Sequence, residues 1–185
     1  MIQPEIRFRG FADEWSQKKL DDLVKYHQPG KYIVESTAYK NKGIPVLTAG
    51  KTFILGYTDE STGIYKNPDG VILFDDFTTA SKLVTFDFKV KSSAIKILTN
   101  DVTSTNLNFL FEVISLLEKL PDNHQRQWIG SFSKQRIMIP SFPEQQKIGA
   151  LFSKYDAIIA LREQKLAELN ALKKGMLQQM FDDGV

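Results

Sequence analysis

The sequence predicts an α+β protein, in which a mixed-strand globular domain is followed by one long C-terminal helix of the coiled-coil type. Short apolar runs rich in β-branched residues, separated by turn signals, fill the first part of the chain. From Ile148 onward, apolar residues instead recur at alternating steps of three and four, the spacing of a helix with one apolar seam. With 42% hydrophobic and 11% aromatic residues, the chain can build a packed core. We therefore expect a domain at residues 1–140 and a helix at residues 141–185.

The strands of the domain follow from local signals. Strands are expected at residues 31–34, 43–48, 52–57, 71–74, 83–90 and 136–140. Residues 20–24 are too short and mixed to decide between a brief strand and a turn of helix. Asn67 to Gly70 is the clearest turn. The aromatic-rich opening at residues 4–15 is expected to be extended and fixed against the domain.

Both predicted helices carry start signals. Helical spacing predicts a first helix over residues 107–120, with Thr105 as its cap and Pro121 as its stop. The long helix begins after Ser141, which can cap it, while Glu144 can reach back to the free amide of the cap. If unbroken to its end, this helix is about 57 Å long.

The long helix carries more apolar surface than its own packing requires. Its seam consists of Ile148, Phe152, Tyr155, Ile159, Leu166, Leu169, Met176 and Met180. Arg162 and Lys173 interrupt this seam, and a second, shorter apolar stripe lies beside it. Such a helix needs a partner, which is either its own domain or another helix. Because a domain of this size has a radius of gyration of about 14 Å, the helix should overhang it.

The composition excludes several kinds of site. The chain has no cysteine, so disulfides, thiolate catalysis and cysteine-bound zinc are excluded. Its two histidines, His27 and His124, are far apart in the sequence, which disfavours a histidine-based metal site or triad. Gly50-Lys51-Thr52 resembles the end of a phosphate-binding loop, but Pro45 occupies the position of the first glycine. No apolar run reaches the roughly 20 residues of a membrane span, and we expect a cytoplasmic protein without its own cofactor.

The charge distribution favours nucleic-acid binding. Residues 18–51 hold seven basic residues against three acids, and residues 123–143 hold no carboxylate, whereas residues 52–76 hold one lysine against five acids. Lysine and arginine can contact phosphates, and hydroxyl, phenol and guanidinium groups can read base edges. The predicted DNA contacts are Lys31, Tyr32, Lys40, Lys42, Thr48, Lys51, Thr52, Arg126, Lys134 and Arg136.

A metal-dependent nuclease is the alternative function. Asp69, after Pro68, and the later Asp87-Phe88-Lys89 have the outline of a P-D…[D/E]-x-K site, in which two carboxylates hold a divalent metal. The same residues also have an ordinary interpretation. Asp69 lies in a predicted turn, and Lys89 suits the exposed face of a strand.

Four stretches resemble the specificity (S) subunits of type I restriction–modification systems. Residues 4–11, continued by Trp15, resemble the start of a target-recognition domain in this family. Residues 139–148 look like the junction into its conserved helical region, and residues 154–181 match that helix in character. Residues 45–51 are similar to one subtype of the recognition domain.

The resemblance implies a non-catalytic subunit that selects a sequence in double-stranded DNA. S-adenosylmethionine, ATP and Mg²⁺ are then expected only in the partner methyltransferase (M) and restriction (R) subunits. S subunits normally carry two recognition domains and two antiparallel conserved helices, whereas this chain holds one of each. It could be a natural half-subunit, a truncated product or an engineered half. We expect it to form a homodimer through its long helix.

Overall fold

The computed structural model describes residues 4–67, 69–117 and 127–181. Its strands are β1 (Ser16–Lys19), β2 (Val24–His27), β3 (Ile44–Leu47), β4 (Ile54–Thr58), β5 (Val71–Asp75), β6 (Ser81–Val84), β7 (Lys89–Val90), β8 (Ile95–Asn100) and β9 (Arg136–Ile139). Its α-helices are α1 (Leu107–Leu116), α2 (Gln127–Gly130) and α3 (Phe142–Phe181). Short 3₁₀ turns are η1 (Leu20–Asp22), η2 (Gly30–Tyr32) and η3 (Phe132–Lys134). The predicted fold class, a mixed-strand domain with a long C-terminal helix, is confirmed.

A four-stranded antiparallel sheet with the order β2-β8-β5-β6 forms the centre of the domain. Because side chains alternate between the two faces of a strand, β5 contributes to two cores. Ile72 and Phe74 lie in the core beneath α1, together with Phe109. Val71 and Leu73 lie in the core on the opposite face.

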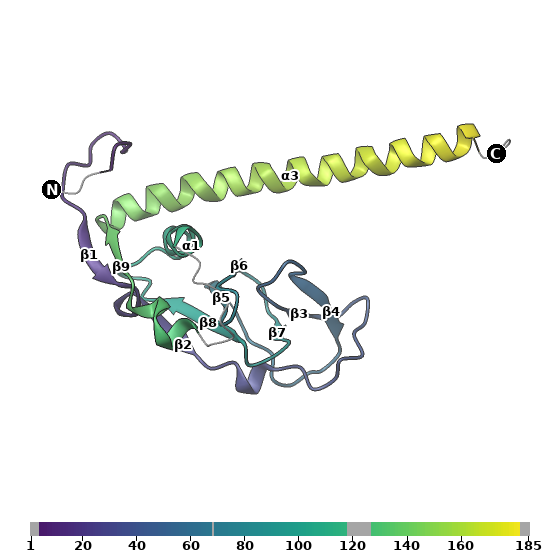
Figure 1. The fold of residues 1–185 in the computed structure, drawn as a ribbon, viewed down its shortest axis with the longest axis horizontal. Helices are drawn as coiled ribbons and strands as arrows, with labels where there is room; N and C mark the ends of the chain where they lie inside the picture. Colours follow the sequence, from purple (N-terminus) through teal and green to yellow (C-terminus); the bar gives the residue numbers. More distant parts are fainter. Residues whose placement is uncertain (1–3, 68, 118–126, 182–185) are drawn as a thin grey trace.

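A second sheet, of order β4-β3-β7, completes the core on that opposite face. β3 and β4 are antiparallel, with an irregularity between Val46 and Leu47, while β3 and β7 are parallel. We call this three-stranded sheet and its connecting loops the β3–β4 lobe. It lies below the middle of α3 in Figure 1, whereas the pair of β1 and β9 lies at the start of α3.

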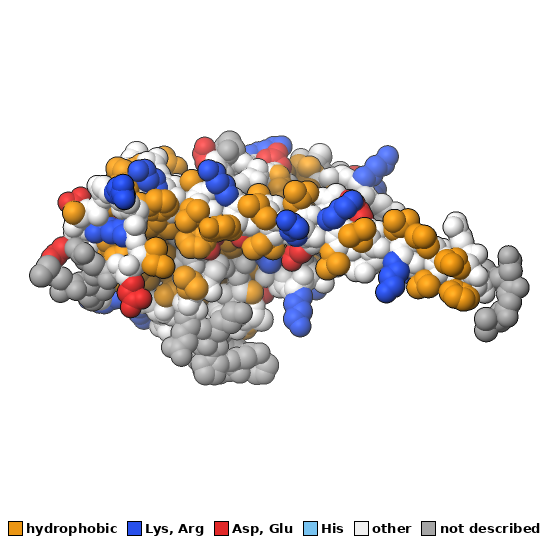
Figure 2. Space-filling model, turned by 90° about the horizontal axis from the view of Figure 1, so that it is seen from above, with side chains coloured by type: hydrophobic (Ala, Val, Ile, Leu, Met, Phe, Trp, Pro, Cys, Tyr) orange, Lys and Arg blue, Asp and Glu red, His pale blue; other side chains and the backbone are white. Residues whose placement is uncertain are grey.

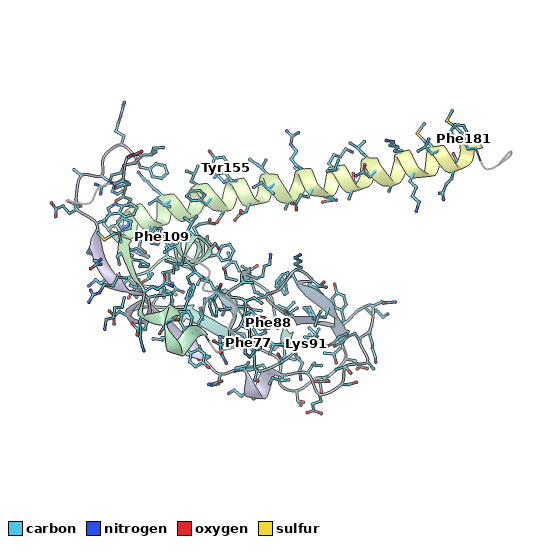
Figure 3. The ribbon with its side chains drawn as sticks, in the orientation of Figure 1. Phe77, Phe88, Lys91, Phe109, Tyr155 and Phe181 are labelled. Carbon is cyan, nitrogen blue, oxygen red and sulfur yellow. The ribbon has the colours of Figure 1, made fainter. Side chains whose placement is uncertain are left out.

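α1 packs against the beginning of α3 (Figure 1). The close approach occurs at Gly149, where an added Cβ would lie 2.4 Å from Asn106 Oδ1 and 3.0 Å from the Phe109 amide nitrogen. Figure 3 shows Phe109 between the first turns of α3 and the sheet. Ile148 packs against the same core, so within the described residues the first turns of α3 are the part anchored to the domain.

Several predicted elements need correction. The strand at residues 31–34 is wrong, since Gly30–Tyr32 forms a 3₁₀ turn and only Ile33 makes a bridge, to Val90. The single strand at residues 83–90 is two strands, β6 and β7, separated by an irregular segment with a bend at Phe86. The central strand β8 was not predicted, because Lys96 interrupts its apolar run and the side chain is nevertheless fully buried.

The start signals of both helices also need correction. Asn106, not Thr105, caps α1, because its side chain accepts a hydrogen bond from the Phe109 amide at 3.0 Å. α1 ends at Leu116 rather than at Leu120, and Pro121 lies outside the described residues. Glu144 does not reach back to the cap of α3. Its two carboxylate oxygens each accept a 2.8 Å hydrogen bond from Arg7 instead.

α3 does not fold back over its own domain. The helix runs 40 residues without interruption, through Gly175, and its far half extends past the sheets in Figure 1. Most of its predicted seam is exposed, from 41% at Phe152 to 71% at Met180. Among the described residues, no helix is long and apolar enough to cross a membrane.

Candidate nucleic-acid interface

The β3–β4 lobe holds five of the predicted DNA contacts. Thr48, Lys51 and Thr52 lie in the turn from β3 to β4, where the Gly50 amide donates a hydrogen bond to Thr48 Oγ1 at 3.1 Å. Lys40 bridges to Tyr57 near the other end of the same strand pair, and Lys42 is exposed just before β3. The lobe therefore presents its basic and hydroxyl side chains in two groups, at opposite ends of β3.

Lys31 and Tyr32 lie beside the lobe, at the top of an aromatic stack. Tyr65 stacks on Phe88 with 5.1 Å between ring centroids, and Tyr32 meets the edge of Tyr65 at 4.9 Å. The Lys31 ammonium lies 5.4 Å from the centroid of the Tyr32 ring. Burial raises the pKa of Tyr65 above its usual 10.0. The stack fixes Tyr32 and Lys31 at the surface, so a ligand can contact them with little further ordering.

The remaining predicted contacts belong to a different part of the domain. Lys134 ends η3 and donates a 3.2 Å hydrogen bond to the carbonyl of Gly130. Arg136 lies on β9 and contacts Gln17 Oε1 at 3.4 Å. In Figure 1, β9 lies on the opposite side of the domain from β3 and β4. Arg126 lies outside the described residues. The structure thus divides the predicted set instead of joining it in one surface.

Three of the five acids at residues 52–76 form ion pairs with lysines of the same domain. Asp59 pairs with Lys40, and this contact lowers the pKa of the Asp59 carboxyl below its usual 3.8. Glu60 pairs with buried Lys89 and also accepts the Ser36 amide at 3.1 Å. These ion pairs neutralise both partners, so the negative charge of residues 52–76 and the positive charge of Lys40 are each smaller than a count along the chain indicates.

The geometry does not support the alternative nuclease site. Lys89 is only 2% exposed and is held by Glu60 and, at 2.9 Å, by the carbonyl of Thr62, so the prediction of an exposed lysine is wrong. Asp87 accepts Lys66 at 2.7 Å and the Asn67 amide at 3.0 Å, and these bonds lower its pKa. Within the described residues, no three histidine or acidic side chains are grouped to hold a metal ion.

α3 presents an apolar face that its own domain leaves open. Figure 2 shows a row of hydrophobic side chains along the helix, on the face turned away from the domain. Figure 3 places Tyr155 on that outer side. The second stripe is open as well, since Ile158, Leu161 and Leu172 are 54–65% exposed. Contiguous exposed apolar surface of this extent is typical of a protein interface.

The start of this face is joined to an apolar groove of about 450 Å³. Ile6, Phe8 and Trp15 from the opening segment form one side of it, and Ile148 and Phe152 form the other. The bidentate contact between Arg7 and Glu144 holds the opening segment against α3, as expected from the sequence. The groove is therefore a preformed end to the exposed face of α3.

Two side chains near the lobe were missed by sequence reasoning. Lys82 lies on the edge strand β6 and Thr79 in the turn before it, and both line a cavity together with Lys51. A lysine on a strand is ordinary in sequence, and the threonine carries no local signal. Their proximity to Lys51 arises only when β6 and the turn after β3 meet in the folded domain.

Comparison with known proteins gives the same family throughout. The type I restriction modification DNA specificity domain matches residues 12–171. The specificity subunit of the type I restriction enzymes EcoR124I and EcoR124II from Escherichia coli is 45% identical over an alignment of 174 positions, which covers 89% of this chain and 43% of that protein. The MjaVIII specificity subunit from Methanocaldococcus jannaschii is 23% identical over an alignment of 192 positions, which covers 94% of this chain and again 43% of that protein. The chain thus spans less than half the length of these curated relatives.

Solved structures share the fold at low sequence identity. The S subunit of a type I restriction–modification system from M. genitalium gives a TM-score of 0.66 at 16% identity, with 94% of this chain and 46% of that chain covered. The HsdS subunit from Thermoanaerobacter tengcongensis gives a TM-score of 0.54 at 15% identity, with 97% and 47% covered. The domain-plus-helix arrangement therefore occurs in S subunits, and the match over residues 12–171 shows that this chain belongs to the type I restriction–modification DNA specificity domain family.

Proposed function

We propose that this chain is a DNA-recognition unit of a type I restriction–modification complex, with recognition at residues 1–140 and assembly at residues 141–185. The observation that carries the proposal is the family match over residues 12–171, which includes both the domain and most of α3. The β3–β4 lobe supports it, since basic and hydroxyl side chains lie at both ends of β3. We place this activity in the cytoplasm, where such a complex meets DNA.

The chain acts in this proposal without chemistry of its own. M subunits supply methyl transfer from S-adenosylmethionine, and the R subunit supplies ATP-driven cleavage with Mg²⁺. The M subunits dock along α3 and the adjoining domain surface. The purified chain should therefore show no methyl transfer, ATP hydrolysis or cleavage by itself. Tritium transfer to DNA by the chain in the absence of M subunit would contradict this role.

The DNA contacts are tested by substitution in the complex with M. We expect a combined alanine variant of Lys31, Lys51 and Arg126 to lose methylation at the target site. A lysine that touches only phosphate should weaken binding to all sequences alike when it is replaced, whereas a base-reading residue should relax specificity at one position. If the folded triple variant methylates the same sites normally, the surface is wrong.

A second copy of the same chain is the partner that we propose for the exposed face of α3. The seam has the same spacing when read in either direction, so two copies can pair antiparallel about a two-fold axis near residue 164. The facing pairs are then Ile148 with Met180, Phe152 with Met176, Tyr155 with Lys173, Ile159 with Leu169, and Arg162 with Leu166.

This register accommodates both polar interruptions of the seam. Lys173 faces the ring of Tyr155, where an ammonium gains a cation–π contact. Arg162 lies over Leu166, and its aliphatic stem can cover the leucine while the guanidinium reaches solvent. The register also brings the C-terminal end of one α3 to the groove beside Ile148 of the other. Each leucine or isoleucine buried in this way stabilises the pair by about 1.5–3 kcal/mol.

The dimer carries two identical recognition units at its ends, so its target should be an interrupted palindrome. Charged residues at Leu166 and Leu169 should separate the dimer and abolish methylation with M subunit, while the domain stays folded. Sedimentation and a map of methylated sites test this. A monomer at tens of micromolar concentration, or a methylated site that is not palindromic, would exclude the homodimer while leaving DNA recognition intact.

A further inference from the structure

A cavity of about 280 Å³, with both polar and apolar lining, lies at the edge of the four-stranded sheet. Its walls are the C-terminal end of α1, the start of β6 and the turn from β3 to β4, which lie close together in Figure 1. Lys51, Lys82, Thr79, Ser81 and Ser115 are its polar lining residues, and Ala49, Ala80, Ile114 and Leu117 line it as well. Among the described residues that line the cavity there is no carboxylate. The lining is therefore suited to a negatively charged ligand.

Thr79 is unusual in both its backbone and its side chain. It has a φ of 57°, in the left-handed region that glycine and asparagine adopt more easily than a β-branched residue. The Asp75 amide bonds the Ala80 carbonyl at 2.8 Å, and the Thr79 amide bonds the Asp75 carbonyl at 2.9 Å, so the hairpin turn fixes this conformation. Residue Thr79 is 4% exposed, and its Oγ1 has no hydrogen-bond partner among the described residues.

A buried hydroxyl without a partner is destabilising, and so is a threonine at this φ. A glycine would remove both costs without loss of the turn. Threonine at this position is explained if its hydroxyl donates to a ligand that enters the cavity. A ligand with exposed oxygen atoms satisfies Thr79 Oγ1 and is attracted by the two lysines.

The other polar groups of the cavity set the charge that the ligand must have. Ser115 Oγ donates to the Phe111 carbonyl at 2.8 Å, and Ser81 Oγ lies 3.4 Å from Ser115 Oγ. The end of α1 adds a partial negative charge. Among the described residues, Lys51 and Lys82 have no ion-pair partner, unlike the buried Lys89. Among the described lining residues, the two lysine charges therefore outweigh the partial charge of the helix end.

We propose that this cavity binds a phosphate group, held by Lys51 and Lys82 and by a hydrogen bond from Thr79. The inference rests on the proposed function for its ligand, which is a backbone phosphate of duplex DNA. A free phosphate ion has the same binding chemistry and is the second source that the experiment must separate. A backbone contact of this kind positions the domain on the duplex and reads no base.

Isosteric variants of Thr79 separate binding from folding. Thr79→Val removes only the hydroxyl, so thermal unfolding should occur at the same or a higher temperature than in the wild type. Its affinity for unrelated duplexes, measured by fluorescence anisotropy at low salt, should fall by about tenfold on all sequences. Thr79→Ser keeps the hydroxyl and should bind like the wild type. Lys82→Gln should lower the slope of log affinity against log salt by about one unit.

Lys154→Gln is the matched control, because Lys154 is an exposed lysine on α3 outside the seam and away from the cavity. It should change neither affinity nor the salt slope. The second arm measures the rise in melting temperature of each variant with inorganic phosphate. Protection of the wild type but not of Thr79→Val, with unchanged DNA binding by that variant, assigns the cavity to a small phosphate ligand.

The outcomes for the cavity and for the proposed function are distinct. If Thr79→Val and Lys82→Gln leave both DNA affinity and phosphate protection unchanged, the cavity is not a phosphate site, although the chain still recognises DNA. If the wild type shows phosphate protection lost in Thr79→Val, but no DNA recognition with M subunit, the cavity stands and the proposed function fails.

Discussion

Two lysines of the domain interior, Lys89 and Lys96, are held by carboxylates rather than exposed to solvent. Lys96 Nζ lies 3.3 Å from Asp76 Oδ2 and donates to the Ser93 carbonyl at 2.8 Å. Asp76 Oδ1 in turn accepts the Trp128 amide at 2.8 Å, which ties α2 to the sheet. Asp76 and Lys96 are each only 1% exposed at the side chain. At the residue scale, buried ion pairs and the hydrogen bonds of their carboxylates join segments that are distant in the sequence.

Loss of one member of this pair should be costly. Lys96→Met leaves the Asp76 carboxylate buried without its cation, and we expect the free energy of unfolding to fall by about 3–5 kcal/mol. The double variant Lys96→Met with Asp76→Asn removes both charges and should lose less than the sum of the single losses. Urea denaturation of the four proteins measures this coupling. Strict additivity would show that the two charges do not interact.

Glu60 makes the stability of the β3–β4 lobe depend on pH. The hydrogen bond from Lys89 lowers the pKa of Glu60 below its ordinary 4.5, against the burial that raises it, and the Ser36 and Glu35 amides add to the lowering. A carboxyl with a lowered pKa contributes stability that is fully present above pH 4.5 and is lost as the pH falls through the lowered value.

Glu60→Gln should therefore be less stable than the wild type at neutral pH, and the difference should shrink as the pH falls below 4.5. Thermal melts from pH 7 to pH 2.5 test this. Glu5→Gln, at an exposed carboxylate near the start of the described chain, serves as the control and should follow the wild-type curve. A constant difference between Glu60→Gln and the wild type at every pH would contradict the interpretation.

At the scale of elements, contact between α1 and α3 depends on a missing side chain. Gly149 lies where the N-terminal end of α1 approaches α3, and an added Cβ would meet three atoms at 3.1 Å or less. Gly175, far along the same helix, has no atom within 4 Å of an added Cβ. Both glycines lie in α3, but only Gly149 is closely surrounded by other atoms. A substitution at one position therefore serves as the control for the same substitution at the other.

Substitution by alanine should have opposite effects at these two positions. Gly149→Ala forces α1 and α3 apart, and we expect a loss of about 1–3 kcal/mol from overpacking. Gly175→Ala removes only the conformational freedom of glycine and should stabilise the helix by about 1 kcal/mol. Chemical denaturation measures the first effect, and helix content near the melting point by circular dichroism measures the second. Equal effects at both positions would mean that the contact at Gly149 is loose.

At the scale of the whole molecule, α3 is a long helix that is attached to the domain at its N-terminal end. Its first turns pack on the domain, and the remainder presents an apolar face to solvent (Figure 2). The proposed antiparallel dimer brings Ile148 of one copy against Met180 of the other. A parallel pair would instead bring Ile148 against its own copy. The two arrangements can be separated chemically, because the chain contains no cysteine.

Two single variants, Ile148→Cys and Met180→Cys, provide that separation. Under mild oxidation, we expect a disulfide-linked dimer when the two variants are mixed and little when either is oxidised alone. Non-reducing electrophoresis and mass spectrometry identify the linked residues. Efficient crosslinking of Ile148→Cys with itself would show a parallel pair. No crosslinking in any sample would exclude the proposed register.

The sequence alone determined the features that have a regular spacing or a local signal. The stepwise recurrence of apolar residues predicted α3, and turn residues with β-branched runs predicted β3, β4, β5 and β9. Resemblance at the two ends of the chain indicated the family, and the match over residues 12–171 confirms it. These elements can be recognised in the sequence because helical and strand periodicity depends on residues that are close together in the chain.

Only the tertiary structure decided the features that depend on distant partners. β8 could not be predicted because Lys96 interrupts its run of apolar residues. The buried ammonium group is tolerated there because the carboxylate of Asp76, from another part of the chain, pairs with it. The predicted DNA contacts divide between the lobe and β9 for the same reason, since spacing along the chain does not fix which loops meet. Thr79, Lys82 and Lys51 form one cavity only because α1, β6 and the turn after β3 converge. Charge and polarity act through space, so their role depends on the contacts that folding makes.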